Sequence, residues 1–273
     1  MPLSALLLVL AAAMLHAAWN VLLGGARDVR AATAVTLGLS VLLFAPVAAA
    51  TWSVEAAAVP WIVASAGLEL LYFVLLTAAY GRSDVSLVYP VARGVAPVLV
   101  LVASIAAGVT LGAWQALGVL LVGAGVALVR GLRGPVDSTG VMLALAIAAS
   151  IAGYTLVDKQ GIAHASPIAY LELVLAPVAA AVLLWHGSPR GLASLRAALG
   201  IRTLTAAVCS FAAYALVLGA LSLAPAAAVA AVRETSILFA VALAAVALRE
   251  PVGPARASGA AFVVVGVVLV ALD

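Results

Sequence analysis

The chain has 273 residues, of which 67% are hydrophobic and only 8% are charged, with a formal net charge of +3 at neutral pH. A soluble globular domain is about 45–50% apolar and about 25% charged, so this composition excludes an ordinary soluble enzyme and indicates a polytopic membrane protein. The basic residues are scattered through short connections, which argues against a nucleic-acid partner. A single cysteine, Cys209, excludes an intrachain disulfide.

Apolar runs of about 20 residues recur along the chain, and each is long enough to cross a hydrocarbon core of about 30 Å as a helix. We expect ten such spans, at residues 3–23, 31–51, 59–79, 85–107, 113–129, 140–160, 167–185, 203–223, 226–248 and 257–272. The connections between them are too short to hold a soluble domain. The sequence therefore predicts an all-α membrane protein with ten transmembrane helices.

Arginines gather in alternate connections, after the first, third, fifth, seventh and ninth spans. They are Arg27, Arg30, Arg82, Arg130, Arg133, Arg190, Arg196, Arg202, Arg249 and Arg256. The opposite side offers only Lys159, at the end of the sixth span. The positive-inside rule therefore places the arginine-rich connections in the cytoplasm and both termini outside, in a multi-pass protein of the plasma (inner) membrane.

The two halves of the sequence resemble each other. Residues 117–128 align with residues 258–269 at an offset of 141, which places Gly118 on Gly259 and Gly125 on Gly266. Because five spans are an odd number, a second copy of the unit enters the membrane from the opposite side. We therefore predict two inverted five-helix repeats, residues 1–133 and 134–273, an arrangement suited to alternating access.

The fourth span carries an arginine near its centre, where a charge costs at least about 2.5–3.5 kcal/mol on insertion scales. Arg93 lies in the run Ser-Leu-Val-Tyr-Pro-Val-Ala-Arg-Gly, and Pro90 and Pro97 flank it, so we expect a kinked helix there. Arg233 stands 140 residues later, in the matching span of the second half. An arginine fork binds carboxylate, phosphate or phosphonate, so two arginines favour an anionic or zwitterionic solute.

Aromatic and amide side chains within the spans complete the predicted binding site. Adjacent helical residues point about 100° apart, so Arg233 and Glu234 cannot both face the cavity, and we assign Arg233 to it. For the tyrosines and Asn20, packing and interhelical hydrogen bonding are the structural alternatives. The predicted binding residues are Arg93, Arg233, Tyr72, Tyr89, Tyr214, Trp19, Asn20 and Tyr154.

Titratable side chains within the spans are candidates for carrying a coupling proton or for pairing with a cationic group of the solute. They are Glu69, Glu172, His16 and Asp158. Glu69 is costly near mid-membrane unless it is paired or protonated. An internal ion pair with Arg93 or Arg233, which would only hold the bundle together, is the structural alternative for Glu69.

Together these features resemble the EamA family of the drug/metabolite transporter superfamily. The resemblance is carried by the ten short spans, the duplication, the His-Ala-Ala-Trp-Asn segment at residues 16–20, the run around Arg93 and the glycine-rich fifth span with its copy in the tenth. It covers essentially the whole chain. It implies a secondary transporter of small metabolites, often an exporter, whose cavity lies between the two halves and is lined mainly by the third, fourth, eighth and ninth spans.

We therefore expect a secondary active exporter of small anionic or zwitterionic metabolites such as amino acids. The alternatives are uptake of phosphonates or other organic anions, and a lipid-headgroup flippase, which would need a laterally open groove. The sequence shows no nucleophile–base pair, histidine-rich metal set or phosphate-binding loop, so neither an enzyme nor a cofactor or metal is expected. Expected partners are a small solute, the lipid bilayer and a coupling proton or other ion, in a monomer or homodimer.

Overall fold

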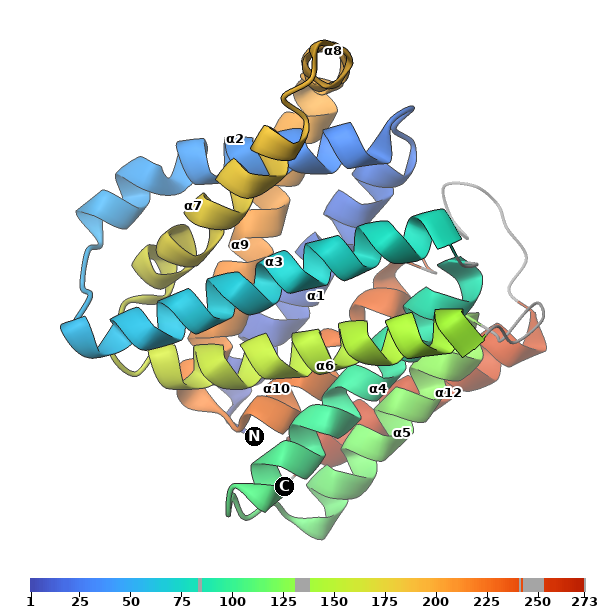
Figure 1. Ribbon diagram of the computed structural model, residues 1–273. Helices are drawn as coiled ribbons and strands as arrows, with labels where there is room; N and C mark the ends of the chain where they lie inside the picture. Colours follow the sequence, from blue (N-terminus) through green and yellow to red (C-terminus); the bar gives the residue numbers. More distant parts are fainter. Residues whose placement is uncertain (83–84, 131–137, 241, 243–252, 273) are drawn as a thin grey trace.

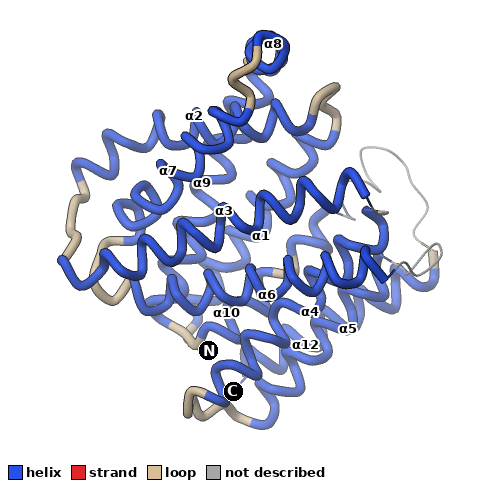
Figure 2. Tube along the Cα trace, viewed as in Figure 1, coloured by secondary structure: helices blue, strands red, loops and turns tan. Residues whose placement is uncertain are grey.

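A computed structural model of the chain describes residues 1–82, 85–130, 138–240, 242 and 253–272, and nearly all of this part is helical (Figures 1 and 2). In chain order the elements are α1 (Leu3–Gly24), α2 (Val29–Ala50), the short 3₁₀ helix η1 (Ala56–Ala58), α3 (Val59–Arg82), α4 (Val85–Ala106), α5 (Ala113–Arg130), α6 (Ser138–Gly161), α7 (Pro167–Trp185), α8 (Pro189–Ala198), α9 (Ile201–Leu223), α10 (Ala226–Arg233) and α12 (Pro254–Leu272). Residues 236–240 are also helical.

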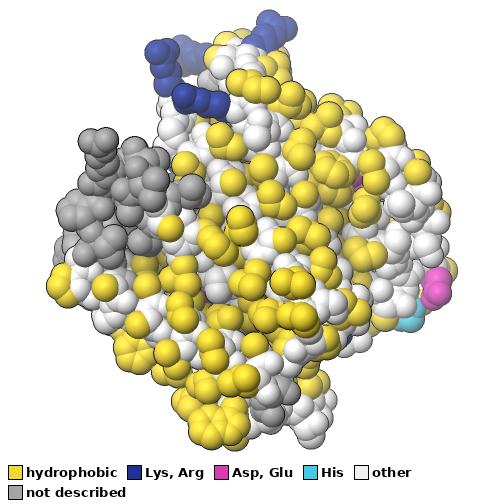
Figure 3. Space-filling view, turned by 180° about the vertical axis from the view of Figure 1, so that it is seen from behind, with side chains coloured by type: hydrophobic (Ala, Val, Ile, Leu, Met, Phe, Trp, Pro, Cys, Tyr) yellow, Lys and Arg dark blue, Asp and Glu magenta, His cyan; other side chains and the backbone are white. Residues whose placement is uncertain are grey.

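Several helices have the length and composition of membrane spans. In the described part six segments qualify, namely α1, α2, Ala56–Ala79, α6, α7 and α9, and shorter apolar helices cover Val91–Ala106, Ala113–Val129 and Ala257–Leu272. The described part of the face shown in Figure 3 accordingly carries many apolar side chains, and basic side chains gather at one end of it. The expected class, an all-helical polytopic membrane protein, is thus supported, whereas the ten-span count and the repeat stay predictions.

Most predicted span boundaries agree closely with the helices, and α7 covers the predicted residues. The predicted span 226–248 is different, because α10 ends at Arg233 and residues 234–235 form a turn before the helix resumes. At this break the backbone N–H groups of Glu234 and Thr235 donate to carbonyls three residues back instead of four. The helix α4 runs without interruption through Pro90 and Pro97, and the kink expected near Arg93 stays a prediction. Residues 243–248 lie outside the described residues.

The helix α8 replaces part of a predicted loop. Ser188 caps it by accepting a hydrogen bond from the backbone N–H of Gly191, and Pro189 occupies its first turn, where a missing N–H costs nothing. None of its residues is buried, and it lies at the end of the molecule opposite the two termini (Figure 1). The termini meet at the other end, where the Met1 amino group lies 3.4 Å from the carbonyl oxygen of Ala271.

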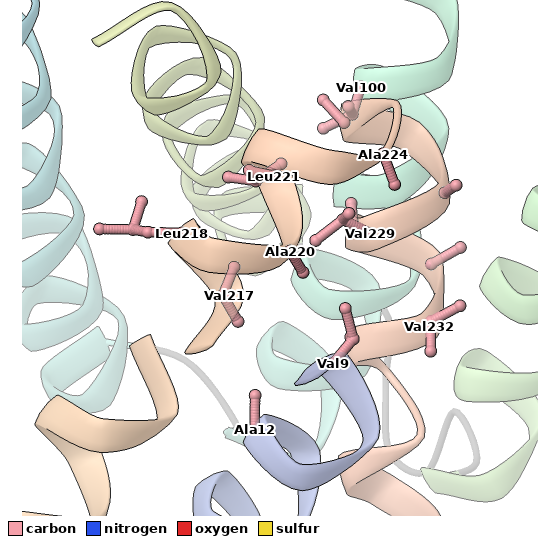
Figure 4. Packing of buried hydrophobic residues seen from close by; sticks show 14 of the residues in the cluster. Val9, Ala12, Val100, Val217, Leu218, Ala220, Leu221, Ala224, Val229 and Val232 are labelled. Carbon is pink, nitrogen blue, oxygen red and sulfur yellow. The ribbon is translucent and has the colours of Figure 1, made fainter. Parts of the chain in front are cut away.

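The interior is built by helices that pair along their lengths: α1 with α9, α2 with α7, α3 with α6, and α5 with α12. Around Val9 of α1, small and branched apolar side chains of α9 and α10 interlock, among them Val217, Leu221 and Val229 (Figure 4). Because lipid tails are as apolar as these side chains, close packing holds the helices together here.

The α5–α12 interface depends on four glycines. A Cβ added to Gly118 would lie 2.5 Å from the Gly266 carbonyl oxygen, and one added to Gly125 would lie 2.7 Å from that of Gly259. Real Cβ atoms do not approach an oxygen so closely, so any larger residue would push the helices apart. The two backbones therefore touch, in the manner of close membrane helix pairs.

Candidate functional site

A cavity of about 310 Å³ lies in the middle of the bundle and is lined from α1, α2, α3, α4, α6, α7, α9 and α10. Its volume lies at the lower end of the range for small-molecule sites, about 300–1,000 Å³. Nine of the predicted site residues line it: His16, Trp19, Asn20, Glu69, Tyr72, Arg93, Tyr154, Tyr214 and Arg233. The rest of the lining is mostly apolar, with Phe73, Leu76 and Leu175 among it.

Arg93 is engaged in an ion pair within the protein. Its Nε lies 3.0 Å from the Glu234 carboxylate, and its Nη2 donates to the Ser236 hydroxyl at 3.3 Å. Arg93 and Glu234 are both buried, in a region where charges are screened little. The pair links α4 to the break that follows α10. The structural alternative for Glu69 was an ion pair with Arg93 or Arg233, and for Arg93 the acid in that position is Glu234.

Arg233, the last residue of α10, is the second arginine of the cavity. It is buried, and its Nε has no hydrogen-bond partner within the described part of the chain. Tyr154, Tyr214 and Glu69 lie within electrostatic reach of its guanidinium. The carboxylate of the adjacent Glu234 points instead to Arg93. Neighbouring residues of a helix point in different directions, so the two side chains do not face the same space. A buried donor without an acceptor costs about 1–3 kcal/mol, so an anionic group placed here would gain correspondingly.

Asp158 of α6 lies beside the cavity, held by three hydroxyl groups. Its Oδ1 accepts hydrogen bonds from Ser65 at 2.5 Å and from Tyr170 at 3.0 Å, and its Oδ2 accepts one from Tyr214 at 2.6 Å. Asp158 is almost completely buried, and the donors come from α3, α7 and α9. One carboxylate therefore joins four helices. Sequence reasoning identified Asp158 and Tyr214 but missed Ser65 and Tyr170, because which hydroxyls meet a carboxylate depends on tertiary packing.

Aromatic rings form much of the cavity wall. The ring centroids of Tyr72 and Tyr154 lie 6.4 Å apart, those of Tyr154 and Tyr214 lie 6.1 Å apart, and His16 contacts Trp19 edge-on at 5.2 Å. These separations are typical of favourable aromatic pairs. The Asn20 amide donates to the His16 carbonyl of its own helix at 2.7 Å. The wall thus offers flat apolar faces beside a few polar tips.

Besides Asp158, two predicted site residues are absent from the cavity lining in the described part. Glu172 of α7 is absent from the lining, and its Oε2 is buried without a hydrogen-bond partner there. Tyr89 belongs to α4, but its side chain lies outside the described residues. The roles predicted for both residues stay predictions.

The two ends of the cavity differ. Toward the arginine-rich end its lining reaches Gly24 and Val29, both of which are exposed. At the opposite end the α2–α3 and α6–α7 connections meet through a β-bridge between Val54 and Ala165. The Glu55 carboxylate also lies 3.1 Å from Nδ1 of His164 there.

The bridge is made by two backbone hydrogen bonds, from the N–H of Glu55 to the His164 carbonyl at 2.9 Å and from the N–H of Ser166 to the Ser53 carbonyl at 2.7 Å. The Ser166 hydroxyl adds a third, to the Thr51 carbonyl at 2.8 Å. Nearby, the Lys159 ammonium donates to the Leu221 carbonyl in the last turn of α9 at 2.5 Å. Segments from the two halves of the sequence are therefore joined at this end.

Comparison with known proteins identifies the second half of the chain. Residues 138–272 match the model of the EamA-like transporter family. A crystal structure with 18% sequence identity superimposes with a TM-score of 0.77, covering 100% of this chain and 98% of that chain, and shows the same fold. A comparison with curated proteins found no match. The family expected from the sequence is thus confirmed over residues 138–272.

Proposed function

Because the chain carries an EamA-like transporter domain at residues 138–272, we propose that it is a secondary active transporter that exports small zwitterionic metabolites such as amino acids. The superfamily to which this family belongs moves drugs and metabolites across membranes. The class of solute and the direction of transport are inferred from the cavity and its charges.

The proposed class of solute rests on the different contacts of the two arginines. Arg93 is already neutralised by Glu234, so it adds little net charge to the cavity. Arg233 is the arginine whose buried Nε lacks an acceptor in the described part of the chain. Its planar fork suits a carboxylate. We therefore assign the carboxylate of the solute to Arg233.

We assign the ammonium group of the solute to the acid Glu69. It is buried, lines the same cavity as Arg233 and can accept hydrogen bonds from an ammonium group. A cavity with one cation and one acid matches a solute that carries both charges better than it matches a simple anion. Trp19, Tyr72 and Tyr154 would cover an apolar or aromatic side chain.

Alternating access is supported by the packing of α5 against α12. Under the offset of 141, the contact of Gly118 with Gly266 becomes the contact of Gly259 with Gly125, and both contacts are present. Cβ atoms at Gly118 and Gly259 would likewise meet Val270 and Val129, which are also 141 residues apart. A two-fold axis between two inverted repeats produces such reciprocal contacts.

The proposed direction is supported by the two ends of the cavity. If the arginine-rich end is cytoplasmic, the side on which the lining reaches the surface is the loading side for export. The contacts that join the α2–α3 and α6–α7 connections would then form the outer closure. Coupling to a proton would use Asp158, Glu69 or His16, which lie in or beside the cavity.

The test uses three matched probes on purified protein in detergent: phenylalanine, phenylpropionate, which lacks the amine, and phenethylamine, which lacks the carboxylate. A ligand at 100 times its Kd stabilises the folded state by about 2.7 kcal/mol, which raises Tm by about 5–10 °C. We expect this rise with phenylalanine and a much smaller one with either truncated probe. The Arg233→Gln variant should lose the response, whereas Arg190→Gln, at an exposed residue of α8, should keep it.

Other outcomes would redirect the assignment. Stabilisation by phenethylamine alone would contradict a carboxylate at Arg233. Stabilisation by phosphonates but not by amino acids would favour the organic-anion alternative and leave Arg233 as the anion site.

A further inference from the structure

A second, smaller groove lies between α2, α3 and α7, next to the central cavity. Its volume is about 150 Å³, below the usual range for a metabolite site. Most of its lining residues are apolar, with Leu70, Val74 and Val182 among them. Val74 is 38% exposed, so the groove opens on the outer surface of the bundle, where the acyl chains of the bilayer lie.

One end of the groove is polar and basic. Arg30, exposed in the first turn of α2, lines it together with Trp185 and His186 at the end of α7. The nearest acid on this connection, Asp28, already caps α2 by accepting a hydrogen bond from the N–H of Ala31 at 3.0 Å. Trp185 is 66% exposed, as is usual for tryptophan at the membrane–water interface.

The groove and the central cavity share part of their walls. Val29, Thr33, Phe73 and Leu76 line both. Only side chains of α2 and α3 therefore separate the space inside the bundle from the groove on its lipid-facing side. Whatever fills the groove supports the side wall of the cavity.

We propose that the groove binds one anionic phospholipid, with an acyl chain against Leu70 and Val74 and the phosphate beside Arg30. Charge decides the occupant, because an exposed arginine at the end of an apolar slot complements a phosphate attached to a hydrocarbon chain. A cation near an anionic membrane surface contributes about fivefold in affinity, by the rule of about 1 kcal/mol per basic residue. The inference concerns lipid binding and holds whatever solute the cavity carries.

The experiment titrates the full-length protein in detergent with dioleoyl phosphatidylglycerol or dioleoyl phosphatidylcholine and counts the retained lipid by native mass spectrometry. The wild type should retain phosphatidylglycerol in preference to phosphatidylcholine. Arg30→Gln should weaken phosphatidylglycerol binding about fivefold and leave phosphatidylcholine unchanged. Arg190→Gln removes the same charge from exposed α8 and should have no such effect.

A second pair of variants tests the acyl-chain slot. Val74→Trp fills the groove and should reduce retention of both lipids, whereas Val63→Trp makes the same change at a 66% exposed residue of the same helix and should reduce neither. Glycerol phosphate in excess should not compete, since it lacks the chain. Equal retention of the two lipids by the wild type, equal effects within either pair of variants, or full competition by glycerol phosphate would each overturn the assignment.

Discussion

The Nε of Arg93 lies 3.0 Å from the carboxylate of Glu234, so the charge at the centre of α4 is balanced by an acid from the other half of the chain. Both side chains are buried, with 10% and 2% of their surfaces exposed. Replacing such a pair by apolar residues is often neutral, but removing one partner leaves the other charge buried and alone. The effects of changing the two residues are therefore strongly coupled, although the pair itself need not add much to the free energy of unfolding.

Arg93→Met should lower the free energy of unfolding by about 3–5 kcal/mol, since it leaves Glu234 uncompensated. Combining it with Glu234→Met should recover most of the loss. Thermal unfolding of the two single variants and the double variant in the same detergent measures the coupling. Additive losses in the double variant would mean that the two residues do not act as a pair.

Glu69→Gln should change solute selectivity more than it changes stability. Replacing a charged acceptor of the ammonium group by a neutral amide oxygen should weaken phenylalanine binding about tenfold, because hydrogen bonds to charged groups contribute about 1.5–3 kcal/mol and neutral ones about 0.5–1.5 kcal/mol. Phenylpropionate, which has no ammonium group, should bind at least as well as before. Glu172→Gln is the control, since Glu172 does not line the cavity. A parallel loss for both probes would place Glu69 outside the ammonium site.

Asp158→Ala should destabilise the protein by about 3 kcal/mol, because it removes the acceptor of three buried hydroxyl donors. Asp28→Ala removes an exposed helix cap and should cost only about 1 kcal/mol. Thermal unfolding compares the two. Similar small losses would show that Ser65, Tyr170 and Tyr214 find other acceptors readily.

Gly118→Ala should destabilise the α5–α12 interface by about 1–3 kcal/mol, since its Cβ would press on the Gly266 carbonyl. Gly259→Ala, the equivalent position under the offset of 141, should cost a similar amount. Gly67→Ala on α3 meets nothing within 4 Å and should be neutral or stabilising by about 0.5–1 kcal/mol. A loss at Gly118 without one at Gly259 would argue against a two-fold arrangement of these helices.

A disulfide across the Val54–Ala165 bridge should lock the closed end. The bridged positions face each other in an antiparallel pair, whose Cα separation of about 4.5–5.5 Å suits a disulfide. In a Cys209→Ala background, Val54→Cys with Ala165→Cys should stop transport into vesicles once oxidised and restore it on reduction. Phenylalanine binding in detergent should persist in the oxidised form. Unimpaired transport by the oxidised protein would show that this end does not open.

The sequence predicted the helices well because a segment in lipid must satisfy its own backbone hydrogen bonds as a helix and must carry apolar side chains. Such apolar runs are visible directly in the sequence. The helix α7 agrees with its predicted bounds for this reason. The helix α8 was missed because it has only ten residues and is not an apolar membrane span. Ser188 followed by Pro189 was the local signal that could have revealed it.

The partner of Arg93 and the break after Arg233 were out of reach of the sequence. The contact of Glu234 with Arg93 joins residues 141 positions apart and depends on how the two halves pack. Residues 234–235 include neither glycine nor proline, so the sequence there does not predict a break. Local propensity cannot show a turn that tertiary contacts impose.

The break after α10 suggests a role for Arg93 that its charge alone does not suggest. Arg233 faces the cavity, and the next residue along the backbone, Glu234, holds Arg93 on the opposite half. A solute that draws Arg233 toward itself would therefore displace the neighbouring carboxylate and, through it, the guanidinium on α4. On this geometry Arg93 would transmit the occupancy of Arg233 to the helix α4 in the first half of the chain.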